Sequence, residues 1–387
     1  MKAVIAMDSF KGSLSSIEAG RSVAEGIRRA DPQAAVVVRP LADGGEGTVD
    51  ALIDGMDGRR HSALVTGPLG VPVNCAYGIL EETKTAVIEM SGAAGITLVP
   101  KEKRNPLETT TYGVGEVIRD AVEKGCRRFI IGIGGSATND GGAGMLQSLG
   151  FGLLDCEGKQ IPFGAKGLGQ LKSISDRSVM PELSECEFRI ACDVTNVLCG
   201  ENGCSAVYGP QKGAAPAIIW QMDRWLSDYA ALARESYPNA NPMQAGTGAA
   251  GGLGFAFLTF TNAVLESGIK IILEETGLEQ YMKDADFVVT GEGRLDGQTA
   301  MGKAPVGVAG LAKKHRIPVI AFAGSVAKEA ARCNQNGIDA FFPVLRSITT
   351  LEEAMKPECA RANLSDTAEQ VFRLLGAAYG SRTGCRR

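Results

Sequence analysis

Residues 1–38 read MKAVIAMDSFKGSLSSIEAGRSVAEGIRRADPQAAVVV and predict a strand, a helix and a second strand. The apolar runs 3–6 and 36–38 are typical of short buried strands. Between them, Ser15 and Glu18 have the spacing of a helix capping box, and apolar residues follow at helical intervals. A strand–helix–strand opening favours a parallel sheet.

The C-terminal third of the chain repeats this pattern. Strands are predicted over 287–289, 319–323 and 341–345, with a helix over 304–315 and another that ends near Gly337. This alternation indicates a doubly wound sheet built from both ends of the chain. The last twelve residues, GAAYGSRTGCRR, are expected to form a loose tail.

The middle of the chain has a different texture, with short strand-like runs and two amphipathic helices. One helix is centred on 114–122 and closed by Gly125, and the other covers 218–232 and is opened by Pro216. We therefore expect an α/β protein of two domains. The doubly wound domain takes 1–65 and 265–387, and a mixed α/β domain, 66–264, is inserted into it.

Composition excludes several classes of function. The 387 residues are 44% hydrophobic and 22% charged, and the net charge is −4, which argues against nucleic acid as a partner. Ten separate cysteines without a CxxC pair, together with two histidines, argue against a zinc site. The chain shows neither a signal peptide nor a membrane span, so reduced thiols and a cytoplasmic location are expected.

The stretch 130–144, IIGIGGSATNDGGAG, carries the strongest chemical signal. It places six glycines around Ser136, Thr138, Asn139 and Asp140 after an apolar strand. Glycine lets the backbone approach a ligand closely, and successive exposed N–H groups form a nest for an anion. The stretch predicts a cradle for a phosphorylated ligand, with Asp140 as a possible metal ligand.

Part of this stretch also matches a dinucleotide fingerprint. Residues 132–137 fit G-x-G-x-x-A, and Asp155 lies where an acid could bind a ribose. The glycines at 141, 142 and 144 would weaken the helix that should receive the pyrophosphate, each by roughly 1 kcal/mol. An NAD-linked oxidoreductase is therefore kept as an alternative.

Five segments combine a strand end with glycines, acids and hydroxyls: MDSFKGS (7–13), LADGGEGT (41–48), GIGGSATNDGG (132–142), CDVTN (192–196) and TGEGRLDGQTAMGK (290–303). Each alone could be only a tight turn. In open α/β sheets, however, ligands bind at the carboxyl ends of the strands, so five such loops can converge on one cleft.

The last of these segments resembles a nucleotide phosphate loop. Residues 297–303, GQTAMGK, match the first seven positions of a Walker A motif, but Ala304 stands where Ser or Thr should bind magnesium. The segment can still be a phosphate-binding loop of another design, in which Lys303 contacts the phosphates. In the alternative, Lys303 is only a solvated residue at the start of a helix.

The five segments, in their longer forms, resemble the bacterial glycerate kinase family of the class that forms 2-phosphoglycerate. They read MDSFKGSLSSIEA, PLADGGEGTVDAL, IGIGGSATNDGGAGMLQSLG, CDVTNVLCGENGCSAVYGPQKGA and VTGEGRLDGQTAMGKAP, in order from residue 7 to residue 305. Met7 and Val197 are the only departures that we notice. The resemblance implies a flavodoxin-like domain with an inserted domain, ATP as donor, magnesium, and D-glycerate as acceptor.

Phosphoryl transfer requires positioning and charge neutralisation. We expect phosphate binding by Gly134, Gly135, Ser136, Thr138 and Lys303. The predicted substrate-binding residues are Asp8, Lys11 and Arg294, and the predicted magnesium ligands are Asp296 and Glu292. Asp193 is the first candidate for general base and Asp43 the second, with Lys11 at the reacting groups. The hypothesis places these groups in a cleft between the domains.

Two alternatives to the kinase remain open from the residues: the NAD-linked oxidoreductase, and a non-catalytic regulator that senses a phosphorylated metabolite. The motifs do not distinguish the 2-hydroxyl from the 3-hydroxyl, and they leave the oligomeric state open.

Overall fold

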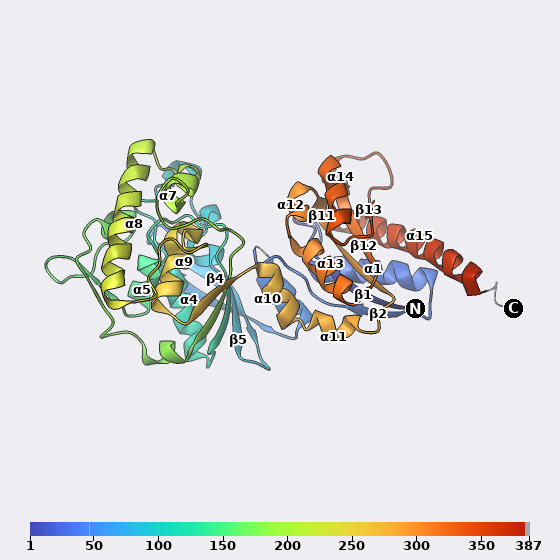
Figure 1. Cartoon of the computed structure of the whole chain (residues 1–387), viewed down its shortest axis with the longest axis horizontal. Coiled ribbons are helices and arrows are strands. Elements are labelled where there is room, and N and C mark those ends of the chain that lie inside the picture. The colour runs from blue at the N-terminus through green and yellow to red at the C-terminus, as the bar shows by residue number, and fades with distance from the viewer. Residues whose placement is uncertain (46, 384–387) are drawn as a thin grey trace. The chain divides into compact units, whose positions relative to one another are not determined.

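The computed structural model describes residues 1–45 and 47–383, and the chain folds into two compact units (Figure 1). Unit 1 comprises Met1–Asp43, Asp50–Met56 and Ile269–Arg387, and unit 2 comprises Gly44–Val49 and Asp57–Gly268. The α/β fold expected from the sequence is confirmed, whereas the domain boundaries near 65 and 265 stay predictions.

Unit 1 is built on a five-stranded sheet in which every strand is parallel to its neighbours. Its spatial order is β13-β12-β11-β1-β2. The strands are β1 (Lys2–Met7), β2 (Ala35–Val38), β11 (Phe287–Leu295), β12 (Val319–Val326) and β13 (Ala340–Pro343). Numbered within the unit, this is the flavodoxin order 2-1-3-4-5, whose switch point lies between β1 and β11.

One face of this sheet is covered by two helices that pack on each other, α1 (Ser16–Ala30) and α15 (Pro357–Thr383) (Figure 1). Alternate residues of β1, Ala3, Ile5 and Met7, are fully buried in this core. A side chain at Gly26 would place its Cβ 2.1 Å from the carbonyl oxygen of Ser365, so only glycine permits the close approach of the two helices. The predicted capping box at the start of α1 is present.

The other helical segments of unit 1 connect or flank these strands. They are α2 (Thr48–Gly55), which begins in unit 2, α10 (Gly268–Glu275), α11 (Leu278–Met282), α12 (Gly297–Ala300), α13 (Ala304–Lys314), the 3-10 helix η5 (Lys328–Asn336) and α14 (Leu351–Ala354).

Two expectations for unit 1 are wrong. Strand β11 does not end at 289 but continues to Leu295, pairing Glu292 with Ala323. Gly291 is there because a Cβ would lie 1.9 Å from the Phe322 carbonyl oxygen, not because the chain turns. The expected loose tail is also helical as far as Thr383, as the end of α15, and residues 384–387 lie outside the described part.

Unit 2 contains a six-stranded mixed sheet in the order β10-β9-β6-β5-β4-β3. The strands β5, β6, β9 and β10 run parallel, and β3 and β4 join antiparallel at one edge. Their bounds are β3 (Arg59–Thr66), β4 (Pro72–Leu80), β5 (Thr85–Glu89), β6 (Arg128–Gly132), β9 (Glu187–Ala191) and β10 (Ala263–Glu266), and a separate hairpin holds β7 (Gly152–Leu154) and β8 (Ser173–Ser175).

Short and long helices complete unit 2. They are α3 (Ser91–Ala94), α4 (Tyr112–Glu123), α5 (Ala143–Ser148), α6 (Ala165–Leu168), α7 (Cys204–Tyr208), α8 (Pro216–Ser236) and α9 (Ala249–Phe260), with the 3-10 helices η1 (Ile96–Leu98), η2 (Lys101–Lys103), η3 (Pro181–Glu185) and η4 (Pro210–Lys212). The helices predicted before Gly125 and after Pro216 are α4 and α8. Within the described residues, every helix is too short or too polar to cross a bilayer.

Candidate active site

The carboxyl ends of β1 and β11 open into a pocket of about 460 Å³ in unit 1. This is the switch point of the sheet, where doubly wound folds bind their ligands. The pocket contains every predicted site residue of this unit, namely Asp8, Lys11, Asp43, Glu292, Arg294, Asp296 and Lys303. Residues that are far apart in the sequence therefore lie together because the parallel strands end at one edge.

Asp8 is the most deeply buried carboxylate of this pocket, with 6% of its surface exposed. Its Oδ1 accepts a hydrogen bond of 2.7 Å from the Ser9 amide. Burial, followed by the negative charge of Asp43, raises the pKa of Asp8 to about 7, and Glu292 contributes in the same direction. Lys11 opposes this rise without cancelling it.

A hydroxyl links the two predicted magnesium ligands. Thr299 Oγ1 donates to Glu292 Oε1 over 2.5 Å, and the Thr299 amide donates to Asp296 Oδ1 over 3.3 Å. Asp296 Oδ1 also accepts from the Gln298 amide at 2.8 Å, so Asp296 caps the short helix α12. Burial raises the pKa of Glu292.

The cations of the pocket come from three different segments. Lys11 and Arg294 are exposed, and Lys303 is half-buried at the start of α13. Arg294 Nε lies 3.8 Å from Asp296 Oδ2, too far for a hydrogen bond, so the contact is only electrostatic. These side chains could engage a small anionic substrate.

The Walker A reading does not fit this geometry. Residues 297–300 form helix α12, and the chain turns at Gly302 before α13 begins at Ala304. A Walker A loop instead runs from a strand through one open glycine-rich turn into a single helix. Lys303 lines the pocket, but the residues before it do not form a Walker A loop.

In unit 2, the glycine-rich loop after β6 presents its tip to solvent. Gly134 and Gly135 are exposed, and Gly135 adopts a left-handed φ of +72°. Within the part of the chain that the structure describes, the amides of Gly134, Gly135 and Ser136 donate no hydrogen bond. Three successive amides without an acceptor are suited to an anion.

The base of the same loop is tied to the unit on several sides. The Ala137 amide donates to the Ala94 carbonyl at 2.9 Å, and the Thr109 hydroxyl donates to the Ala137 carbonyl at 2.9 Å. Further along, the Asn139 side chain donates to Ser205 Oγ over 2.8 Å. The tip therefore rests on an ordered frame.

Asp140 is fully buried and organises the turn after the loop. Its Oδ2 accepts from the amide and the hydroxyl of Thr111 at 2.8 and 2.9 Å and from the Gly144 amide at 3.3 Å, and its Oδ1 accepts from the Gly142 amide at 3.2 Å. The suggestion that Asp140 could bind a metal is wrong, because its oxygens are occupied by protein donors. Glycine spacing alone does not show that the carboxylate points inward.

Ser136 and Thr138 lie beneath the tip and are buried, at 8% and 0% exposure. The Thr138 hydroxyl has no partner among the described residues. Beneath them lies Lys212, whose Nζ donates to both residues. No periodicity or motif in the sequence predicts that Lys212 lies under this loop.

Asp193 follows β9, the neighbour of β6 in the sheet of unit 2. The side chain is exposed, and its Oδ1 accepts from the Gly268 amide at 3.2 Å. Because Ala191 pairs with Gly132, this carboxylate and the glycine-rich loop leave the same edge of the sheet.

The dinucleotide interpretation is not supported by the structure. Residues 135–137 of the fingerprint pair with residues 94–96, and the next helix, α5, begins only at Ala143. Asp155 follows β7 in the separate hairpin, where its Oδ1 accepts from the amides of Glu157 and Lys159 at 2.9 Å. A dinucleotide fingerprint needs a strand, a glycine turn and a helix in one unit.

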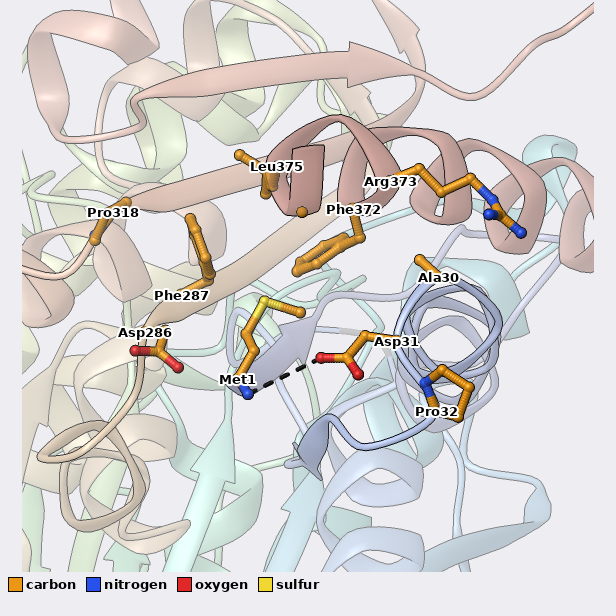
Figure 2. Close-up of a pocket in the computed structure, with 11 residues that line it drawn as sticks. Met1, Ala30, Asp31, Pro32, Asp286, Phe287, Pro318, Phe372, Arg373 and Leu375 are labelled. Atoms are coloured by element: carbon orange, nitrogen blue, oxygen red, sulfur yellow. Dashed lines mark ion pairs between the residues drawn. The ribbon is translucent and has the colours of Figure 1, made fainter. Parts of the chain in front are cut away.

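A second pocket of unit 1, of about 640 Å³, lies at the amino ends of β1, β11 and β12 (Figure 2). Figure 2 shows Phe287 and Phe372 in its wall and an ion pair of 4.0 Å between the N-terminal amine and Asp31. It is the larger pocket, but it holds none of the predicted site residues. Ligands of such sheets bind at the carboxyl ends, so the smaller pocket is the better candidate.

The fold and the site together define a two-unit α/β protein with a glycine-rich loop after β6 and a carboxylate-rich pocket. Residues 3–376 match the model of the Glycerate kinase family. The chain is 49% identical over 356 residues to the Glycerate 2-kinase of Escherichia coli, covering 92% of this chain and 93% of that protein. It is also 47% identical to a Glycerate kinase of Haemophilus influenzae, over 98% of this chain and 100% of that one.

A solved structure, titled as a putative glycerate kinase 2 from Salmonella typhimurium LT2, superposes with a TM-score of 0.91 at 46% identity, covering 98% of this chain and 99% of that one. The chain belongs to the glycerate kinase family. The resemblance seen in its motifs is thereby confirmed, and with it the expectation that the chain is an enzyme of this family.

Proposed function

We propose that this protein transfers the γ-phosphoryl group of ATP to the 2-hydroxyl of D-glycerate and releases 2-phospho-D-glycerate and ADP. The family supports phosphorylation of glycerate, and the name of the E. coli relative supports the 2-position. The observation that carries the proposal is the pocket at the switch point of unit 1, which combines carboxylates with Lys11 and Arg294. Such a set can bind a small hydroxy acid and neutralise transferred charge.

The acceptor is proposed to bind through its carboxylate to Lys11 and Arg294, with Asp8 accepting a hydrogen bond from a glycerate hydroxyl. Lys11 is exposed in the loop before α1, and it provides a point charge near the reacting oxygens. Arg294 provides planar donors that match a carboxylate.

The ATP phosphates are proposed to bind to the amides of Gly134 and Gly135 and to Ser136, with Lys303 as a further contact. The exposed tip and its unpaired amides support this assignment. The role of Thr138 stays a prediction, because its hydroxyl lies fully buried below the tip.

The carboxylates of the unit 1 pocket fit a magnesium ion. Within the described residues, no group of three or more His, Cys, Asp or Glu side chains could form a metal cage by itself. Magnesium at kinase sites usually takes one or two carboxylates and completes its shell with water and substrate phosphates. Glu292 and Asp296 are proposed to bind it, and the neighbouring carboxylates of Asp8 and Asp43 support a cation there. When bound, magnesium would neutralise phosphate charge during transfer.

Asp193 is proposed as the general base, and Asp43 as the second candidate. Replacing the true base by Asn should lower kcat by about 10²–10⁴-fold with little change in KM, because proton removal from the acceptor hydroxyl is lost. Asp155→Asn is the matched control, because its side-chain oxygen still accepts from the turn amides and it is not a predicted site residue. Near-full kcat in Asp193→Asn would transfer the role to Asp43.

The overall activity is tested by measuring ADP formation from ATP and D-glycerate with and without magnesium. Enolase separates the products, since it converts 2-phosphoglycerate and leaves 3-phosphoglycerate unchanged. A product that enolase does not consume would refute the 2-position, and absence of glycerate-dependent ADP would refute the kinase. Nicotinamide absorbance, unchanged in the expected case, reports on the oxidoreductase alternative.

A cytoplasmic location is also proposed. Each cysteine that the structure describes is a free thiol, which suits a reducing compartment.

A further inference from the structure

Lys212 is a buried cation in unit 2 whose place in the chemistry is unassigned. It ends η4, and 2% of its surface is exposed. Its Nζ donates to Ser136 Oγ at 2.8 Å and to the Thr138 carbonyl oxygen at 2.6 Å. Both acceptors belong to the glycine-rich loop, directly below its exposed tip.

The charge of Lys212 has no carboxylate contact among the described residues. Asp140 and the Cys204 thiol are the titratable groups that face it, and the Asp140 oxygens accept from Thr111, Gly142 and Gly144 instead. Burying a cation without an ion-pair partner is costly, and a neutral donor could hold the loop at lower cost. A counter-ion that arrives with the ligand would offset this cost.

The loop above Lys212 offers a place for that counter-ion. The amides of Gly134, Gly135 and Ser136 are successive and have no acceptor in the part of the chain that the structure describes. The buried Thr138 hydroxyl also lacks a partner there. Two independent features, a buried cation and a set of unpaired donors, therefore converge on one loop.

We propose that Lys212 is a positioning residue for phosphate binding: from below, it holds Ser136 and Thr138 in place and its charge attracts a nucleotide phosphate seated on the amides of residues 134–136. This rests on the proposed function, in which the loop binds ATP. Lys212 acts on the phosphate in two ways: it holds Ser136 in position, and its positive charge attracts the phosphate.

The protonation of Lys212 should make nucleotide binding depend on pH in a way that can be measured. Burial lowers the pKa of Lys212 to about 8, while the charge of Asp140 opposes the decrease. A phosphate above the loop favours the ammonium form and raises this pKa again. Binding near pH 8.5 must then take up a proton, and affinity must fall as the pH rises further.

The test is calorimetric titration of the whole protein with the β,γ-imido analogue of ATP and magnesium, at pH 8.5, in two buffers of different ionisation enthalpy. Wild type should show proton uptake. Lys212→Met should bind at least tenfold more weakly without uptake. Lys212→Arg should stay within about fivefold of wild type and also show no uptake, because guanidinium remains charged. Ser136→Ala should weaken binding but keep the uptake.

A merely structural role would lower the melting temperature of Lys212→Met without any proton signal in wild type. Absence of uptake in wild type overturns the proposal even if Lys212→Met fails to fold. Unchanged affinity in a folded Lys212→Met overturns it as well. If wild type does not bind the nucleotide, the proposed function fails at this loop, and tripolyphosphate is titrated instead. Uptake that depends on Lys212 then retains the inference, and its absence refutes it.

Discussion

The glycine-rich loop of unit 2 and the pocket of unit 1 differ in the polar groups that they offer to a ligand. In the loop, the buried carboxylate Asp140 accepts four hydrogen bonds from the protein, and the unpaired groups are donors. In the pocket, the carboxylates of Asp43 and Glu292 lie close enough to Asp8 to raise its pKa. A loop with unpaired donors suits phosphate, and a pocket with several carboxylates suits a metal cation and a hydroxyl group.

This contrast predicts opposite consequences when one carboxylate is neutralised in each region. Asp140→Asn should destabilise the protein by about 3–5 kcal/mol, because an amide nitrogen would face donors that are buried and left unpaired. The measurement is chemical unfolding at pH 7.5. Asp155→Asn, which alters a carboxylate at a partly exposed turn, should change stability by less than about 1 kcal/mol. An equally small effect for Asp140→Asn would mean that the loop is not held as described.

The two regions also differ in how far the sequence could predict them. The pocket follows from a general rule, because Asp8 and Glu292 come from strands that were recognisable and whose carboxyl ends meet at the switch point. The α1 capping box follows from an equally local signal, whereas the flavodoxin-like order was implied only by the family resemblance.

The frame of the loop could not be predicted in the same way. Asp140 among glycines looks like a ligand-binding acid until its burial is seen, and Lys212 lies 76 residues from Ser136. Long-range contacts of this kind leave no periodicity in the sequence. Gly291 shows the same limit, since a glycine required by the neighbouring strand was taken for a turn.

The second prediction reverses the sign of the first. Asp8→Asn should stabilise the protein by about 2–4 kcal/mol at pH 8, because burial raises the pKa of Asp8 from its ordinary 3.8 to about 7 in the folded state. Between these values the folded state binds more protons than the unfolded state, so wild type loses stability as the pH rises from 4 to 7. The Asn variant lacks this loss, while its Oδ1 can still accept from the Ser9 amide.

Melting temperatures of wild type and Asp8→Asn at pH 5, 6.5 and 8 check this prediction. The two curves should converge towards pH 4, separate progressively between pH 4 and pH 7, and keep a constant difference above pH 7. A constant difference across the range would show that Asp8 does not titrate as its burial demands. The variant should still have low activity, because a stabilising change in a site that binds ligand is commonly costly for function.

The smallest expected effect concerns the cation that would balance the pocket. Glu292→Gln should raise the magnesium concentration for half-maximal activity about tenfold, equivalent to about 1.4 kcal/mol, because one charged oxygen ligand becomes neutral. The Thr299 hydroxyl can still donate to the amide oxygen, so α12 should keep its position. Glu329→Gln, which alters an exposed carboxylate on η5 outside the pocket residues, is the matched control. If Glu292→Gln and Glu329→Gln show the same magnesium dependence, Glu292 does not bind the metal, and Asp296 is left as the proposed ligand.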